Sequence, residues 1–258
     1  METYLTVDIG NSAVSIALLK GLRVYYSENV DVNQPVREFT GAMKKVLATV
    51  RRGNHDLTAV LVCSVVPAKN RSVRNLITKN LGIRPHFVGE ELDVPLINKY
   101  RDPAQVGRDR LVGAYAAQKL FGQPAIIIDF GTAITLDVLS RDGHYMGGII
   151  VPGMRLSLES LHSKAALLPR IEEVRRPRSV IGRTTEHSIL SGLVYGYGEM
   201  CRGLVRRISR DIEGRPGIVV TGGYARLMVQ FLSELAPAVD THLVHKGLVL
   251  CYHHHIRA

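Results

Sequence analysis

VDIGNSAVSI at residues 7–16 and IDFGTAITL at residues 128–136 are two versions of one pattern. Each is an apolar run that reaches an aspartate, a glycine and a short polar turn, followed by a second apolar run, which is typical of a β-hairpin. The two versions align when one residue is left out near the turn, and their aspartates, Asp8 and Asp129, stand nearly half the chain apart. This internal repeat predicts two similar halves, each built on a hairpin.

The 258 residues of the chain lie between the size of one large domain and that of two small ones. Outside the hairpins, strand patterns are predicted at 22–30, 57–65, 84–88, 144–153 and 218–221, and helical spacing at 36–51, 70–81, 111–120, 187–208, 224–235 and 243–254. We therefore expect an α/β fold with a first half at 1–113 and a second half at 114–240. A C-terminal helix within 241–258 is expected to pack back on the first half.

The composition sets further limits. Hydrophobic residues make up 46% and charged residues 22% of the chain, which excludes a disordered or coiled-coil protein. No apolar run reaches the ~18 residues of a membrane span, and the N-terminus lacks a secretory signal pattern, so we expect no membrane association. Cys63, Cys201 and Cys251 are odd in number and form no CxxC pair, which favours a reducing compartment and hence the cytoplasm.

The formal net charge of +10 raises the question of a nucleic-acid partner. The basic residues are scattered along the chain, however, and there is no recognition motif and no Trp. A basic protein that binds small anions is the favoured reading, and direct nucleic-acid binding is not expected.

The repeated turns have the residue types of a phosphate site. Glycine lets the backbone approach a ligand closely, and successive N–H groups in a tight turn can bind an anion. A carboxylate beside them can hold a cation that offsets phosphate charge. An ordinary Asx-type turn is the other reading of a single copy. A third glycine motif, VTGGYA at 220–225, follows an apolar strand and precedes a helix, where an anion is also favoured.

In this order the three motifs resemble those of acetate kinases, sugar kinases, heat-shock cognate chaperones and actin. Within that superfamily the chain resembles type III pantothenate kinases, through DIGNS (8–12), YRDPAQVGRDR (100–110), DFGTAITLD (129–137), GGIIVPG (147–153), IGRTTEHSILSGLVYGYG (181–198) and VTGGYA (220–225). The resemblance implies two ribonuclease H-like (actin-like ATPase) halves with mixed sheets flanked by helices. It also implies ATP-dependent phosphorylation of pantothenate to 4′-phosphopantothenate, the first step towards coenzyme A, by a homodimer that uses Mg²⁺ and K⁺ or NH₄⁺.

The resemblance also implies which residues bind ATP. The first hairpin would bind the phosphates through Asp8, Ile9, Gly10, Asn11, Ser12, Ala13, Val14 and Ser15. Asp8 would lie near the divalent metal, Asp129 would hold the monovalent cation, and Thr132 would contact ATP. Ser12 stands where the family usually has threonine, and it keeps the hydroxyl group.

Pantothenate binding is implied for Tyr100, Gly107, Arg108, Asp109, Arg110 and Thr185, with Asp109 as the general base. Thr184 stands where the family commonly has asparagine. The chemistry fits, because a carboxylate can accept the proton of a substrate hydroxyl and neighbouring positive charge keeps it ionised. An adjacent arginine can bind a substrate carboxylate with two hydrogen bonds. On the residues alone, a salt-bridge cluster at a helix start stays open as the other reading.

Two other functions are consistent with the same motifs. One is a kinase of the same superfamily that acts on another small hydroxyl compound, such as a sugar; the GxDR stretch with Tyr100 argues against it. The other is a catalytically weak relative with a regulatory role, for which the net charge is the only support. The presence of Asp8, Asp109, Asp129 and Thr132 argues against lost catalysis.

Overall fold

The computed structural model describes residues 2–32, 36–52 and 57–257, and within these the side chains of 36, 37 and 50–52 are not described. The chain forms two compact units, which we describe one at a time. Unit 1 comprises Met1–Leu96, Arg101–Ala116 and His242–Ala258, and unit 2 comprises Ile97–Tyr100 and Ala117–Thr241. The domain limits at 113 and 240 stay predictions from the sequence.

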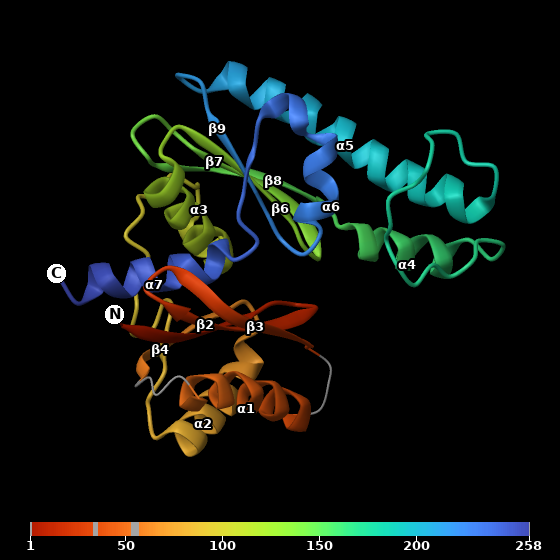
Figure 1. The fold of residues 1–258 in the computed structure, drawn as a ribbon. Helices are drawn as coiled ribbons and strands as arrows, with labels where there is room; N and C mark the ends of the chain where they lie inside the picture. Colours follow the sequence, from red (N-terminus) through yellow and green to blue (C-terminus); the bar gives the residue numbers. More distant parts are fainter. Residues whose placement is uncertain (1, 33–35, 53–56, 258) are drawn as a thin grey trace. The chain divides into compact units, whose positions relative to one another are not determined.

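Unit 1 is built on a five-stranded mixed sheet in the order β3-β2-β1-β4-β5 (Figure 1). The strands are β1 (Thr3–Ile9), β2 (Ala13–Lys20), β3 (Arg23–Asp31), β4 (Leu57–Ser64) and β5 (His86–Phe87). β1, β2 and β3 form an antiparallel meander, whereas β4 runs parallel to β1, and β5 runs parallel to β4.

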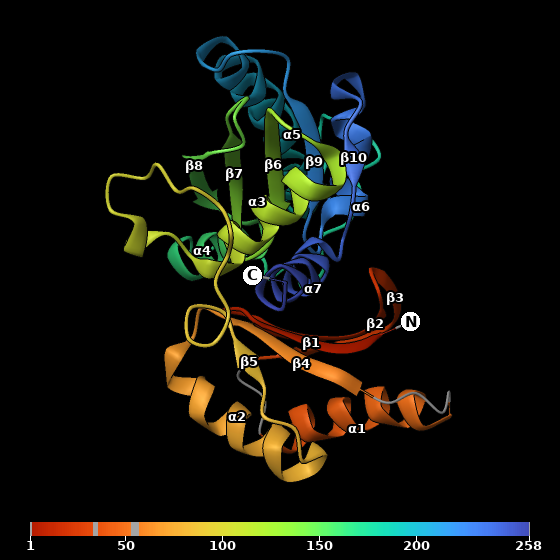
Figure 2. The same cartoon turned by 90° about the vertical axis from the view of Figure 1, so that its left-hand side faces the viewer.

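Helices cover both faces of this sheet. Helices α1 (Val36–Arg52) and α2 (Pro67–Leu81) pack against one face, where Val7 and Ile16 meet Met43 and Ile77 (Figure 2). On the other face, α7 (Leu243–His255) and the first part of α3 (Arg108–Phe121) pack against β1 and β4, with Val112 and Leu248 in the core. Alternate residues of β1 therefore point to two different cores, as the two-residue period of a strand requires.

Unit 2 repeats this topology. Its strands are β6 (Ala125–Phe130), β7 (Ala133–Leu139), β8 (Tyr145–Pro152), β9 (Gly217–Thr221) and β10 (Ala238–Val239), in the order β10-β9-β6-β7-β8. β6 pairs antiparallel with β7 and parallel with β9, just as β1 pairs with β2 and β4. The internal repeat predicted from the two hairpins is confirmed.

The alignment gap in the repeat has a structural cause. Asp8 pairs with Ser15 in the first hairpin and Asp129 pairs with Thr135 in the second, so the first turn is one residue longer. Both turns close in the same way: the Gly10 N–H donates to the Ala13 carbonyl at 2.9 Å, and the Gly131 N–H donates to the Ala133 carbonyl at 3.1 Å.

The long helix α5 (Thr185–Asp211) lies along one face of the second sheet with α4 (Met154–Lys164), which the sequence did not predict. The predicted helix over 224–235 is wrong. The chain there forms the short α6 (Ala225–Met228) and the 3₁₀ turns η2 (Val229–Phe231) and η3 (Ser233–Leu235). Phe231 stacks edge-on against Tyr195 and crowds Gly198 of α5, so tertiary packing overrides the local helical spacing.

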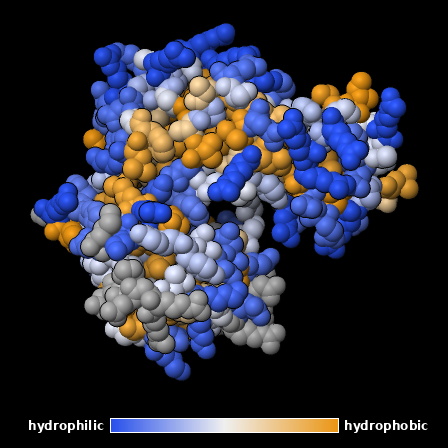
Figure 3. All heavy atoms as spheres, viewed as in Figure 1, coloured by the Kyte–Doolittle hydropathy of each residue, from blue (hydrophilic) through white to orange (hydrophobic). Residues whose placement is uncertain are grey.

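Unit 2 also exposes apolar side chains at one end. Leu167 is 96% exposed, and Ile181 is 80% exposed, in the irregular segment between α4 and α5. Leu156 and Leu161 of α4 are partly exposed as well. In Figure 3, orange apolar spheres appear among blue ones at this end of the unit, at the right of the view. No helix in the described ranges is long and apolar enough to cross a membrane.

Candidate active site

The first predicted phosphate turn lies at the end of β1 and the start of β2. Asp8 and Ser15 are direct partners in the antiparallel ladder, and both are half-buried. Ile9 and Val14 point into the core under α1 and α2, so only their backbone can meet a ligand. Asn11, which begins the exposed turn, is followed by Ser12 and Ala13, both also exposed. The hairpin thus presents backbone and polar groups on the face opposite to α1 and α2.

Asp109 stands in the first turn of α3, where its Oδ1 accepts a hydrogen bond from the Arg110 N–H at 2.8 Å. The same oxygen lies 2.5 Å from where a Cβ on Gly107 would be. Any side chain at 107 would therefore displace the Asp109 carboxylate. This contact gives a physical reason for glycine two positions before the aspartate in the GxDR stretch.

In unit 1, Asp8 and the GxDR stretch both lie at the end of β4, because a Cβ on Gly107 would lie 3.8 Å from Cγ1 of Val65, which follows that strand. Cys63 pairs with Asp8 in the parallel ladder and is fully buried. Burial raises the pKa of the Cys63 thiol well above its usual value, and the negative charges of Asp8 and Asp109 raise it further. The neighbouring Val65 N–H donates to the Ile9 carbonyl at 3.0 Å. The two carboxylates that the sequence assigned to metal binding and to base catalysis therefore belong to segments that meet at the end of β4.

Sequence reasoning missed Gly89, which follows β5. Its φ is +79°, and a Cβ there would lie 2.5 Å from Cζ and 2.7 Å from one terminal nitrogen of the Arg108 guanidinium. Arg108 therefore lies directly over the backbone of Gly89, and a positive φ is itself unfavourable for other residues. A glycine directly after a short strand was the only sequence signal of this contact.

In unit 2, Asp129 lies at the end of β6 between Thr135 of β7 and Thr221 of β9. Gly222 has a φ of +92°, and a Cβ there would overlap Oδ1 of Asp129 and lie 2.7 Å from the backbone N and C of Phe130. The third glycine motif thus packs directly on the second hairpin through Gly222. The sequence named both motifs but did not show that they touch.

The turn at Gly131 and Thr132 is also held from a second side. Gly153, in the GGIIVPG stretch, donates its N–H to the Thr132 carbonyl at 3.0 Å. A Cβ on Gly153 would lie 2.5 Å from the Gly131 carbonyl oxygen, so only glycine fits. The Thr132 side chain remains exposed at the tip of the hairpin.

The predicted substrate residues Tyr100 and Thr185 lie in different parts of unit 2. The Tyr100 ring packs on Gly147 of β8, with two ring carbons 3.2 Å from the position of a Cβ there. Thr185 is the exposed first residue of α5. Thr184 caps this helix, because its Oγ1 accepts from the His187 N–H at 3.2 Å. Threonine and asparagine are both good N-cap residues, so the departure from the family pattern keeps the cap.

Asp137, the last residue of the DFGTAITLD stretch, lies on β7. It is buried, and the Tyr145 hydroxyl donates to its Oδ1 at 2.6 Å. The Thr135 hydroxyl donates to its Oδ2 at 3.0 Å. The bond from Tyr145 joins β8 to β7, and the bond from Thr135 lies within β7, so both favour a structural role for Asp137 over cation binding.

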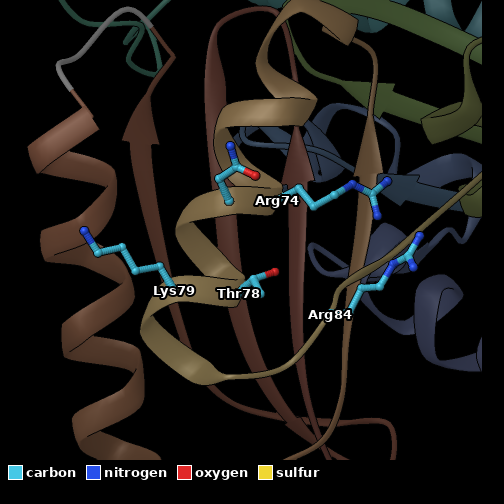
Figure 4. Close-up of a pocket in the computed structure, with 5 residues that line it drawn as sticks. Arg74, Thr78, Lys79 and Arg84 are labelled. Atoms are coloured by element: carbon cyan, nitrogen blue, oxygen red, sulfur yellow. The ribbon is translucent and has the colours of Figure 1, made fainter.

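A separate hollow of about 490 Å³ lies on α2 and the loop after it, lined by Arg74, Asn75, Thr78, Lys79 and Arg84 (Figure 4). It contains none of the predicted site residues. Glu91 pairs with Arg74 at 2.7 Å and with Arg84 at 3.1 Å. Burial opposes ionisation of Glu91, but the Phe87 N–H and the Arg74 guanidinium lower its pKa to about 2. Glu90 also pairs with Arg74, so two carboxylates offset the charges of the two arginines, and we assign no ligand to this hollow.

Comparison with known structures shows the fold. A Baf family transcriptional activator from Campylobacter jejuni matches with a TM-score of 0.61 at 16% identity, over 98% of this chain and 100% of that one. The activator of 2-hydroxyisocaproyl-CoA dehydratase from Clostridium difficile, with bound ADPNP, matches at 0.60 and 13% identity, over 99% and 96%. A ROK family glucokinase from Streptomyces griseus matches at 0.56 and 12% identity, over 99% and 100%.

These likenesses confirm the expected actin-like ATPase fold, with two mixed sheets flanked by helices. The sequence comparison goes further, because the family model of type III pantothenate kinases matches residues 4–207, most of the chain. That range contains both hairpins and the GxDR stretch. The chain therefore belongs to the type III pantothenate kinase family, and it is a phosphotransferase.

Proposed function

We propose that this protein transfers the γ-phosphoryl group of ATP to the primary hydroxyl of pantothenate, giving 4′-phosphopantothenate and ADP. The observation that carries the proposal is that Asp8 and the stretch with Arg108 and Asp109 both lie at the end of β4 in unit 1. A carboxylate beside an arginine suits a substrate that has both a hydroxyl to be deprotonated and a carboxylate to be held.

Asp109 is the general base of the proposed reaction. As the bond forms between the substrate oxygen and the γ-phosphorus, the bond from that phosphorus to the ADP oxygen breaks, and the hydroxyl proton passes to the Asp109 carboxylate. The hydrogen bond from the Arg110 N–H fixes the orientation of this carboxylate. Phosphoryl transfer needs mainly positioning and charge neutralisation, so a base with a fixed orientation is a sufficient chemical group.

Arg108 holds the pantothenate carboxylate in this proposal. Its guanidinium packs against the backbone of Gly89. A guanidinium held in this way can form a bidentate hydrogen bond to a carboxylate. Tyr100, on Gly147, and Thr185, at the start of α5, complete the proposed substrate contacts.

Replacing Gly89 with alanine tests the placement of Arg108. We expect KM for pantothenate to rise about 10-fold or more, because a charge-assisted hydrogen bond contributes about 1.5–3 kcal/mol. Gly82→Ala is the matched control: Gly82 also has a positive φ, +68°, but no atom lies within 4 Å of its Cβ position. Both variants should lose about 1–2 kcal/mol of stability through backbone strain. Equal KM values in the two variants would count against the role of Arg108.

Asp8 and Asp129, the carboxylates of the two hairpins, suit the divalent and monovalent cations that the family implies. When bound, Mg²⁺ neutralises phosphate charge during transfer. Asp8 offers a half-buried carboxylate oxygen at the strand end, which suits a hard cation. In unit 2, Asp129 pairs with Thr135 and Thr221 in the sheet, and we propose that its carboxylate holds K⁺ or NH₄⁺.

A second copy of the chain is the proposed partner. Leu167 and Ile181, with Leu156 and Leu161 of α4, expose apolar surface of the kind that subunit interfaces bury (Figure 3). We expect light scattering to give twice the 28.5 kDa mass of one chain. The three cysteines are free and buried, which is consistent with a reducing compartment such as the cytoplasm.

A substrate panel tests the proposed function. With ATP and Mg²⁺, we expect ADP release to depend on pantothenate and to stay at background with glucose or N-acetylmannosamine. Phosphorylation of a sugar but not of pantothenate would make the chain a sugar kinase of the same fold. Turnover of none of them would favour the regulatory alternative, which the name of the Campylobacter jejuni neighbour also suggests.

A further inference from the structure

A histidine that the sequence reasoning missed lies beneath the first phosphate hairpin. His245 of α7 is only 3% exposed, and its ring bridges β1 and β2 within unit 1. Its Nδ1 lies 2.8 Å from Oγ1 of Thr6, and its Nε2 lies 2.9 Å from Oγ of Ser15. Ser15 is the residue that pairs with Asp8 in the hairpin.

The hydrogen bonds determine where the protons are. A threonine hydroxyl has one proton, and Thr6 donates it to the Ala17 carbonyl at 3.2 Å. Thr6 must therefore accept from His245, so the proton of the ring is on Nδ1. The ring is 3% exposed and its two nitrogens bond to hydroxyl groups, not to a carboxylate that could stabilise a positive charge. Burial, with a smaller contribution from His242, accordingly lowers the pKa of His245 to about 3, so the ring is neutral and Nε2 carries no proton. Ser15 must then donate its hydroxyl proton to Nε2.

This chain of bonds ends beside the proposed nucleotide site. Thr6 and Asp8 are two residues apart on β1, so their side chains share one face of the sheet, and Ser15 shares it as the direct partner of Asp8. Because the Ser15 hydroxyl proton is used in the bond to His245, its oxygen can still accept a hydrogen bond but has no proton left to donate. An ionised phosphate oxygen has no proton to donate to the Ser15 oxygen. A metal-bound water can donate a hydrogen bond to this oxygen, and a metal ion can be coordinated by it.

We propose that His245 is a positioning residue that holds Ser15 as a hydrogen-bond acceptor, so that Ser15 supports the metal side of the bound nucleotide and not its phosphate oxygens. The inference rests on the proposed ATP site and assigns two roles within it. His245 acts only through Ser15 and touches no substrate.

The protonation state can be read in the wild-type protein. In protein with ¹⁵N-labelled histidine, long-range ¹H–¹⁵N spectra at neutral pH should show His245 neutral, with a protonated Nδ1 and a bare Nε2. A ring protonated on Nε2, or on both nitrogens, would overturn the proposal, because Ser15 would then be free to donate to phosphate.

Two variants then separate the two hydrogen bonds. The asparagine amide of His245→Asn reaches the Nδ1 position and can still donate to Thr6, but it cannot reach Ser15. The longer side chain of His245→Gln can place an oxygen near the Nε2 position. We expect His245→Asn to weaken binding of Mg-ADPNP by about 3- to 10-fold, the effect of one hydrogen bond, with His245→Gln closer to wild type. Binding of ADPNP without Mg²⁺ should not change.

Ser15→Ala provides the double-mutant cycle. We expect His245→Asn to cause no further loss in the Ser15→Ala background, because both changes remove the same acceptor. Additive losses, equal losses with and without Mg²⁺, or wild-type affinity in His245→Asn would each overturn the proposal. If the wild type binds Mg-ADPNP but does not phosphorylate pantothenate, the proposed substrate is wrong and this inference still stands. If it binds no nucleotide, the proposed function and this inference both fall. If the variants do not fold, the spectrum of the wild type decides.

Discussion

Replacing Asp109 with asparagine is expected to lower kcat by about 10²–10⁴-fold, which is the usual contribution of a general base. An asparagine oxygen can still accept the bond that Asp109 takes from the Arg110 N–H, and it fits the same space over Gly107. The fold should therefore be kept while the proton acceptor is lost. Steady-state kinetics with pantothenate and ATP would measure kcat, and thermal unfolding would verify the fold.

Asp102→Asn is the matched control for this change. Asp102 is exposed and caps the short 3₁₀ helix η1 (Pro103–Gln105), where its Oδ1 accepts from the Ala104 N–H at 3.2 Å. Asparagine caps equally well, so we expect wild-type kinetics. A near-normal kcat for Asp109→Asn, with this control also unchanged, would refute the assignment of the base.

The second large effect is expected at Gly222, the first glycine of the third motif. Gly222→Ala would place a Cβ against the Asp129 carboxylate and 2.7 Å from the Phe130 backbone, at a φ of +92°. Because backbone cannot move as a side chain can, we expect a loss of stability of about 1–3 kcal/mol from strain alone. Displacement of Asp129 should also weaken ADPNP binding by about 10-fold or more, the equivalent of one charge-assisted hydrogen bond.

Gly223→Ala separates this effect from a general need for glycine. No atom lies within 4 Å of a Cβ on Gly223, which is exposed. Thermal unfolding of this variant should resemble that of the wild type. Equal destabilisation of the two variants would show that the contact between Gly222 and Asp129 does not hold the motif in place.

The architecture could be predicted from the sequence because the hairpins are local. Each hairpin is formed by residues close in sequence, so its apolar pattern and turn glycine identify it, and the repeat of 7–16 at 128–136 then predicts two related sheets. The helix over 224–235 was wrong because Phe231 packs against α5, a contact that no local pattern shows. The same limit applies to α4, in which Met154 and Leu158 are buried but Leu156 and Leu161 are exposed.

The site could be predicted only in part, for a related reason. Gly107 and Asp109 are close in sequence, and their contact agrees with the motif. The contact of Gly89 with Arg108, and the bond from Ser15 to His245, join residues that are far apart in sequence. His245 has no motif around it, because its role depends on burial between two strands and not on its neighbours in the chain.

The central claim is that this chain phosphorylates pantothenate at a site that uses a monovalent cation. The most direct measurement is phosphorus NMR of the products after purified protein is incubated with ATP, Mg²⁺ and pantothenate, in K⁺ buffer and in buffer with neither K⁺ nor NH₄⁺. We predict one 4′-phosphopantothenate for each ADP in K⁺, and weaker ATP binding with slower turnover when both cations are absent. Hydrolysis of ATP to free phosphate with no phosphopantothenate in K⁺ buffer would contradict the claim.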